Sequence, residues 1–200
     1  MPFPHWQFFE SLDDELILLS RTIDFAKENF PTHSVHLTRM YLAICSEVDV
    51  VSKLLCSRIA PKEKARTIDD YRELIKDFYP KIPEVKVTIP FHDLVFEPWI
   101  EWKSGVNPLW WNNHNKVKHE RNKYYQNGNL GNVLLSAAGL LIILTYYHQP
   151  EICAYNPPSI LRLRRIKSMR VPQKYFTYDQ VQYDLPDFYK KAPESVTKQV

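Results

Sequence analysis

The chain has 200 residues, of which 44% are hydrophobic and 14% aromatic, and its formal net charge is +3 at pH 7. This length fits one domain with or without a tail, and the apolar content excludes a disordered chain. Only four glycines are present, and the sequence contains no glycine-rich phosphate loop, G-x-S-x-G or paired-cysteine motif, which excludes the chemistry that those motifs carry.

The first half of the chain predicts three helices. Apolar residues at helical spacing predict the first over 10–29. Ser34 is placed as the N-cap of a long second helix that ends near Ile59. The run from Thr67 to Asp70 has the pattern of a capping box and predicts a third helix that ends at Phe78.

The second half predicts an irregular segment and two more helices. Residues 80–98 are β-branched and interrupted by prolines, which predicts an extended segment with one short edge strand. A fourth helix is predicted over 108–125, then a turn at Asn127-Gly128, and a fifth helix over 130–148. We therefore expect an all-α fold, a four- to five-helix bundle at 1–149.

Two segments fall outside this predicted bundle. Residues 80–107 form an irregular insertion between the third and fourth helices, and residues 150–200 form an extended basic tail that packs on the bundle. The apolar run 130–147 is long enough to approach a membrane span, but polar and small residues interrupt it and no basic flank follows. We expect a buried bundle helix and no membrane contact.

The N-terminus and the cysteines predict the compartment. The first fifteen residues, MPFPHWQFFESLDDE, lack the basic and apolar regions of a signal peptide. Cys45, Cys56 and Cys153 have neither metal-ligand nor disulfide spacing, which is typical of a reducing environment. We expect a cytoplasmic protein that uses no metal and no cofactor.

Positive charge is concentrated in the second half of the chain. Residues 110–174 hold ten Lys or Arg against two acids, whereas residues 1–100 hold twelve against sixteen. Such asymmetry suggests a polyanion partner such as RNA, although a solvated charged face is the common alternative. The candidate nucleic-acid-binding residues in the tail are Arg162, Arg164, Arg165 and Lys167.

Helical wheels place an unusual group of polar residues. Glu47 falls inside the apolar arc of the second helix, and a buried carboxylate needs a partner, so we expect it to contact Lys118 or Arg121 of the fourth helix. On the fourth helix, solvent-facing and apolar arcs leave a third face. Its polar residues are His114, Asn115, Lys118, His119, Arg121 and Asn122.

This third face permits two interpretations. One is a buried polar network in which the same residues hold helices together. The other is a site in which His119 moves a proton on RNA while Arg121 and Lys118 stabilise charge on phosphate and Asn115 orients His119. Glu47, His114 and Asn122 would support that site. Neither interpretation requires a metal.

Two stretches resemble a known family. NPLWWNNHNKVKHER followed by NLGNVLLSAAGLLIILTYY, together with LAICSEVDVVSKLLC at 42–56, resembles the HEPN (higher eukaryote and prokaryote nucleotide-binding) helical domains of the Asn-x-x-Lys-His-x-Arg type. The resemblance implies an all-α, dimeric domain. It also implies a metal-independent endoribonuclease or RNA-binding effector of a bacterial toxin–antitoxin or phage-defence system, with RNA and an antitoxin or defence protein as partners.

The sequence departs from the usual signature of that family, an Arg followed four to six residues later by His. After Arg121 the chain has Gln126 where a His is expected. The site is therefore either rearranged around His119 and Arg121 or not catalytic. In the latter case the chain is a helical interaction or scaffold protein, or an RNA-binding module that uses its basic tail.

Overall fold

The structure is a computed structural model that describes residues 4–149 and 159–163 of the chain. Within them, six α-helices make up most of the fold, which confirms the mainly helical class, and three short strands form one antiparallel sheet. The helices are α1 (Pro4–Ser20), α2 (Val35–Ile59), α3 (Ile68–Phe78), α4 (Leu109–His119), α5 (Arg121–Tyr124) and α6 (Leu130–Tyr147). The strands are β1 (Val87–Ile89), β2 (Leu94–Phe96) and β3 (Arg162–Leu163).

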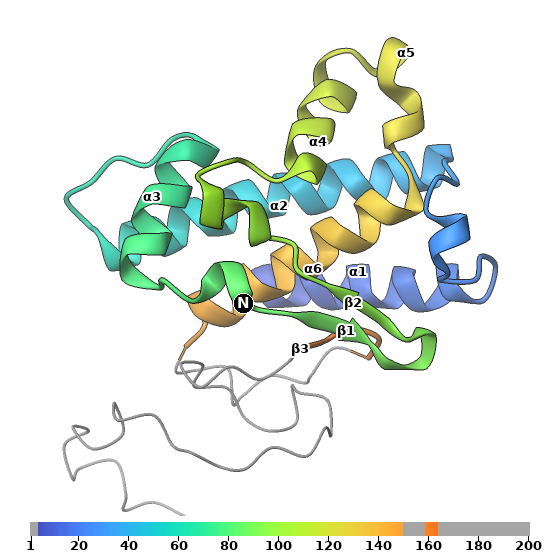
Figure 1. Cartoon of the computed structure of the whole chain (residues 1–200), viewed down its shortest axis with the longest axis horizontal. Coiled ribbons are helices and arrows are strands. Elements are labelled where there is room, and N and C mark those ends of the chain that lie inside the picture. The colour runs from blue at the N-terminus through green and yellow to red at the C-terminus, as the bar shows by residue number, and fades with distance from the viewer. Residues whose placement is uncertain (1–3, 150–158, 164–200) are drawn as a thin grey trace, which may run out of the picture.

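Helices α2 and α6 lie side by side at the centre of the fold (Figure 1). Because α6 is apolar on all sides, its neighbours must cover it completely, and nearly every residue from Leu130 to Tyr146 is buried. Gly139 permits close packing of two tryptophan rings on α6. A Cβ at that position would lie 3.1 Å from the Trp110 ring and 3.4 Å from the Trp99 ring.

Helix α6 is, among the described residues, the one helix that is long and apolar enough to cross a membrane by length and composition. Its mean hydropathy is 1.7, and most of it is buried inside the fold. Such burial is consistent with the core helix of a water-soluble protein, as expected from the sequence.

The prediction of a first helix over 10–29 is wrong at both ends, because α1 runs from Pro4 to Ser20. It starts earlier because Trp6 and Phe9 extend the buried stripe of Leu12 and Leu16 by two turns. It ends earlier because Phe25 is drawn out of helical register to pack on the ring of His92, with centroids 5.2 Å apart.

The segment 80–107, predicted to be irregular with one edge strand, contains two paired strands and belongs to the core. β1 and β2 form an antiparallel hairpin, and β3 pairs with the other edge of β1, which gives the order β2-β1-β3. Val87, Ile89, Trp99 and Trp102 from this segment are fully buried. The sequence did not reveal the sheet because β3 lies far downstream.

Part of the predicted tail is therefore integrated into the fold. Leu161 is fully buried, and the carboxylate of Asp13 on α1 accepts hydrogen bonds from the backbone amides of Ser159 (2.5 Å) and Ile160 (3.4 Å). Burial raises the pKa of Asp13, whereas these hydrogen bonds and the charge of Arg162 lower it. The N-terminal helix and the β3 segment thus hold each other in place.

Candidate functional site

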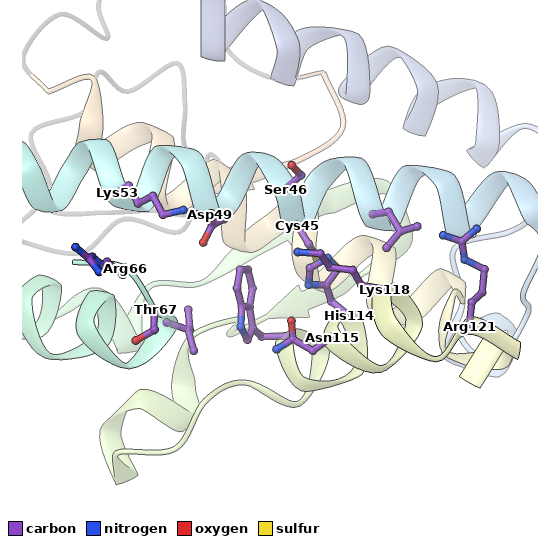
Figure 2. Close-up of a pocket in the computed structure, with 13 residues that line it drawn as sticks. Cys45, Ser46, Asp49, Lys53, Arg66, Thr67, His114, Asn115, Lys118 and Arg121 are labelled. Atoms are coloured by element: carbon purple, nitrogen blue, oxygen red, sulfur yellow. Dashed lines mark hydrogen bonds and ion pairs between the residues drawn. The ribbon is translucent and has the colours of Figure 1, made fainter. Parts of the chain in front are cut away.

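A cleft of about 590 Å³ opens where α2, the start of α3, α4 and α5 meet. Its volume falls within the range of about 300–1,000 Å³ that is typical of small-ligand sites. Figure 2 shows α2 along one wall, with Arg66 and Lys53 toward one end and Arg121 at the other. Side chains from four elements therefore converge on one hollow.

The apolar side of α4 determines which of its polar residues reach this cleft. Trp110 and Val117 are buried. The hydroxyl of Tyr41 on α2 donates a hydrogen bond to the backbone carbonyl of Trp110. These contacts hold α4 against α2, so that the adjacent face with Asn115 and Lys118 borders the cleft.

The cleft is lined by more cations than carboxylates. Arg66, Lys118 and Arg121 are exposed, and no carboxylate of the described residues lies within ion-pair distance of them. Asp49 is the one carboxylate among the lining residues, and its Oδ2 accepts a hydrogen bond from Lys53 Nζ at 2.5 Å. Three unpaired cations around one hollow favour the binding of an anion.

His114 is the histidine that lines the cleft, and it is 5% exposed. Burial lowers its pKa to about 4, with further lowering from the charges of Lys118 and His119, while Asp49 acts in the opposite direction. The ring is therefore neutral at pH 7. Its Nδ1 atom is buried and has no hydrogen-bond partner among the described residues.

Cys45 also lines the cleft, but it is not a nucleophile. Its side chain is completely buried, and burial raises the pKa of the thiol well above its usual value. The group is therefore a neutral thiol at pH 7. The thiolate, which is the reactive form, is not populated. The imidazole of His114 and the cations are therefore the groups in the cleft that could take part in a reaction.

Four of the residues predicted from the sequence come together in this cleft: His114, Asn115, Lys118 and Arg121. Two others, His119 and Asn122, are exposed but do not line it.

A break in the helix explains the position of these two residues. The predicted helix over 108–125 is interrupted at Glu120, whose φ of −134° and ψ of 47° are not helical, so the chain continues as the short helix α5. His119 is the last residue of α4, and Asn122 follows the break. A helical wheel that continues through Glu120 therefore places Asn122 on the wrong face.

The predicted partner of Glu47 is wrong. Its Oε1 lies 2.6 Å from Nδ1 of His5 on α1, and Glu47 does not line the cleft beside Lys118 and Arg121. The wheel placed Glu47 inside the apolar arc of α2, and in the structure its side chain lies half-buried at the edge of that arc. However, that edge faces α1, whereas the opposite edge, with Asp49, faces α4.

Sequence reasoning missed several cleft residues. Asp49, Lys53 and Arg66 were not among the predicted site residues, and Arg66 lies in the loop before α3. The signal that was available is the position of Arg66 next to the capping box at Thr67. A residue at a helix start is held in place by the cap, and this favours a defined side-chain position.

Of the four predicted nucleic-acid-binding residues in the tail, Arg162 alone is among the described residues. Arg162 lies in β3 and is half-buried, on the sheet and not in the cleft. Arg164, Arg165 and Lys167 lie outside the described residues. Among the described residues, no group of three or more His, Cys, Asp or Glu side chains is arranged to hold a metal ion.

Comparison with known proteins assigns no family to the chain: no protein-family model, no curated protein and no solved structure matches it.

Proposed function

We propose that the cleft binds the phosphate backbone of RNA and that the chain is an RNA-directed effector of the HEPN-like type. The observation that carries this proposal is the charge of the cleft, where Arg66, Lys118 and Arg121 are unpaired and Asp49 is already bound by Lys53. Phosphates are the anions that such clusters of Lys and Arg bind in nucleic-acid-binding proteins.

Exposure of the predicted site favours this proposal over a structural polar network. Asn115, Lys118, His119, Arg121 and Asn122 are all exposed. A network that held helices together would bury these groups and pair them with one another. The polar face of α4 is instead open to solvent, as a binding site requires.

Binding is tested with fluorescein-labelled single-stranded RNA in EDTA, measured by fluorescence anisotropy over a range of salt. Lys118→Gln is the test variant, and Lys116→Gln is the matched control, because Lys116 is exposed on the same helix but does not line the cleft. We expect Lys118→Gln to weaken binding and to reduce the salt slope of log K by about 0.7. Equal behaviour of the two variants would refute the cleft as the RNA site.

RNA cleavage in this cleft would use His114 in place of His119. The neutral imidazole accepts the proton of the ribose 2′-hydroxyl, and the 2′-oxygen attacks phosphorus while the bond to the 5′-oxygen breaks. The leaving 5′-oxygen then takes the proton back from His114. Lys118 and Arg121 stabilise the charge of the phosphorane, and a bound phosphate would raise the pKa of His114 toward neutrality.

The cleavage step is tested by incubation of total RNA with the protein in EDTA, with His114→Gln and His119→Gln compared. Loss of cleavage in His114→Gln alone assigns proton transfer to the cleft, whereas loss in His119→Gln alone returns it to the histidine expected from the sequence. If the wild type binds RNA but does not cleave it, the chain is an RNA-binding effector without chemistry.

The HEPN-like resemblance further suggests a cytoplasmic homodimer with an antitoxin or defence protein as partner. These proposals rest on the resemblance alone. Sedimentation of the purified protein would distinguish a dimer from a monomer.

A further inference from the structure

The cleft extends beyond the residues that the proposed cleavage step uses. On α2 its lining residues extend from Leu42 to Lys53, and Figure 2 shows Lys53 and Arg121 toward opposite ends. At 1.5 Å per residue along a helix, Leu42 and Lys53 lie about 16 Å apart. The hollow is therefore elongated, and a second cation, Arg66, stands at the end remote from Arg121 (Figure 2).

Arg66 is held at this end through its backbone. Its amide donates a hydrogen bond to Asp70 Oδ2 at 2.7 Å, and its carbonyl accepts one from the buried Tyr71 hydroxyl at 3.2 Å. Asp70 also accepts from the amide of Thr67 at 2.8 Å as part of the capping box of α3. The carboxylate of Asp70 is thus used by the cap, and the guanidinium of Arg66 remains without an ion pair among the described residues.

The carboxylate of Asp49, a hydrogen-bond acceptor, separates the two cationic ends of the cleft. Asp49 lies between Arg66 and Lys118 along the cleft, and Lys53 and the Tyr71 hydroxyl, at 2.5 and 2.9 Å, hold its two oxygens. A phosphate would avoid this carboxylate, whereas a hydroxyl donor would be attracted to it. The order cation, acceptor, cation matches the alternation of phosphate and sugar along one nucleic-acid strand.

We propose that Arg66 forms a second phosphate subsite, so that one strand of RNA lies along α2. One phosphate contacts Lys118 and Arg121, a phosphate further along the strand contacts Arg66, and a ribose 2′-hydroxyl between them donates to Asp49. A hollow of about 590 Å³ holds a segment of a single strand and not a duplex. This inference rests on the proposed function and adds the extent and direction of the bound strand.

The test compares a dinucleotide, which has one internal phosphate, with a hexanucleotide of the same base, both single-stranded. The protein variants are Arg66→Gln and, as the matched control, Lys64→Gln, an exposed residue of the same loop that does not line the cleft. Thermal melting of Arg66→Gln verifies that the fold is retained, since its backbone hydrogen bonds do not depend on the side chain.

We expect Arg66→Gln to weaken hexanucleotide binding and to leave dinucleotide binding unchanged. For the hexanucleotide the salt slope of log K should fall by about 0.7, so between roughly 50 and 200 mM salt the variant loses about 2.6-fold less affinity than the wild type. A DNA hexanucleotide, which lacks the 2′-hydroxyl, should bind more weakly than RNA to the wild type.

Three results would overturn the subsite. If the hexanucleotide binds in a manner that depends on Lys118 but not on Arg66, the second subsite is wrong while the proposed function stands. If neither oligonucleotide binds to the wild type, both the subsite and the proposed function are wrong. Duplex RNA that binds as well as the single strand would also contradict the inference.

Discussion

The buried His114 should make the stability of the protein depend on pH in a specific way. Its pKa is about 4 in the folded protein, against an ordinary value of about 6.5 in the unfolded chain. Because the folded value is the lower one, the unfolded chain takes up the proton first as pH falls. The stability that neutral His114 provides is therefore complete above about pH 6.5 and is lost as pH falls toward 4.

The magnitude follows from these two values. At pH 7 the folded protein binds almost no proton at His114 and about a quarter of the unfolded chains bind one, whereas at pH 5 the unfolded chain is mostly protonated and the folded protein is not. The free energy of unfolding should therefore decrease by about 2 kcal/mol between pH 7 and pH 5 through this one group. Its ring is 5% exposed, so solvent screening does not reduce this value substantially.

The assay is urea denaturation of the wild type and of His114→Gln at both pH values. Carboxylates that titrate in this range affect both proteins equally, so the difference in free energy of unfolding isolates His114. That difference should shift by about 2 kcal/mol in favour of the variant from pH 7 to pH 5. His36→Gln, at a half-exposed histidine of α2, controls for the substitution. A difference for His114→Gln that stays constant with pH would refute the buried neutral imidazole.

Three further experiments test the packing. Asp13→Ala removes the acceptor of two backbone amides, so it should cost about 1–3 kcal/mol and speed hydrogen exchange at residues 159 and 160; unchanged exchange would contradict that contact. Gly128→Ala should cost about 1–3 kcal/mol, because its Cβ would lie 2.1 Å from Thr38 Oγ1, and a neutral effect on denaturation would argue against this close approach. A double-mutant cycle of His5→Ala and Glu47→Ala should give a coupling of at least about 0.5 kcal/mol, whereas additive effects would show no direct interaction.

Capping motifs in the sequence correctly predicted where α2 and α3 begin. Ser34 caps α2 by accepting a hydrogen bond from the amide of Leu37 at 3.1 Å, and Thr67 and Asp70 form the predicted capping box of α3. Both motifs act within four residues, so the sequence contains all the information that they need. The apolar run of α6 predicted a buried helix for the same reason.

Contacts between distant segments were not predictable in this way. The partner of Glu47 depends on which helix covers each edge of α2, and the sheet depends on pairing between Thr88 and Arg162. The cleft contains residues of both kinds, those that local patterns predict and those that only contacts between distant segments bring together. Its α4 residues were predicted from one helical face, whereas Asp49 and Arg66 join them only because α2 and α3 pack beside α4.

The contact between Asp13 and the β3 segment has a consequence for how the chain folds during synthesis. Its two partners are separated by 146 residues, and β3 closes the sheet on a strand made long before it. On the ribosome, α1 and the β1–β2 hairpin emerge first. The sheet is completed only when residues 159–163 have also emerged. Contacts of such long sequence separation slow folding, so the nascent chain exposes an open strand edge until residues 162–163 have emerged.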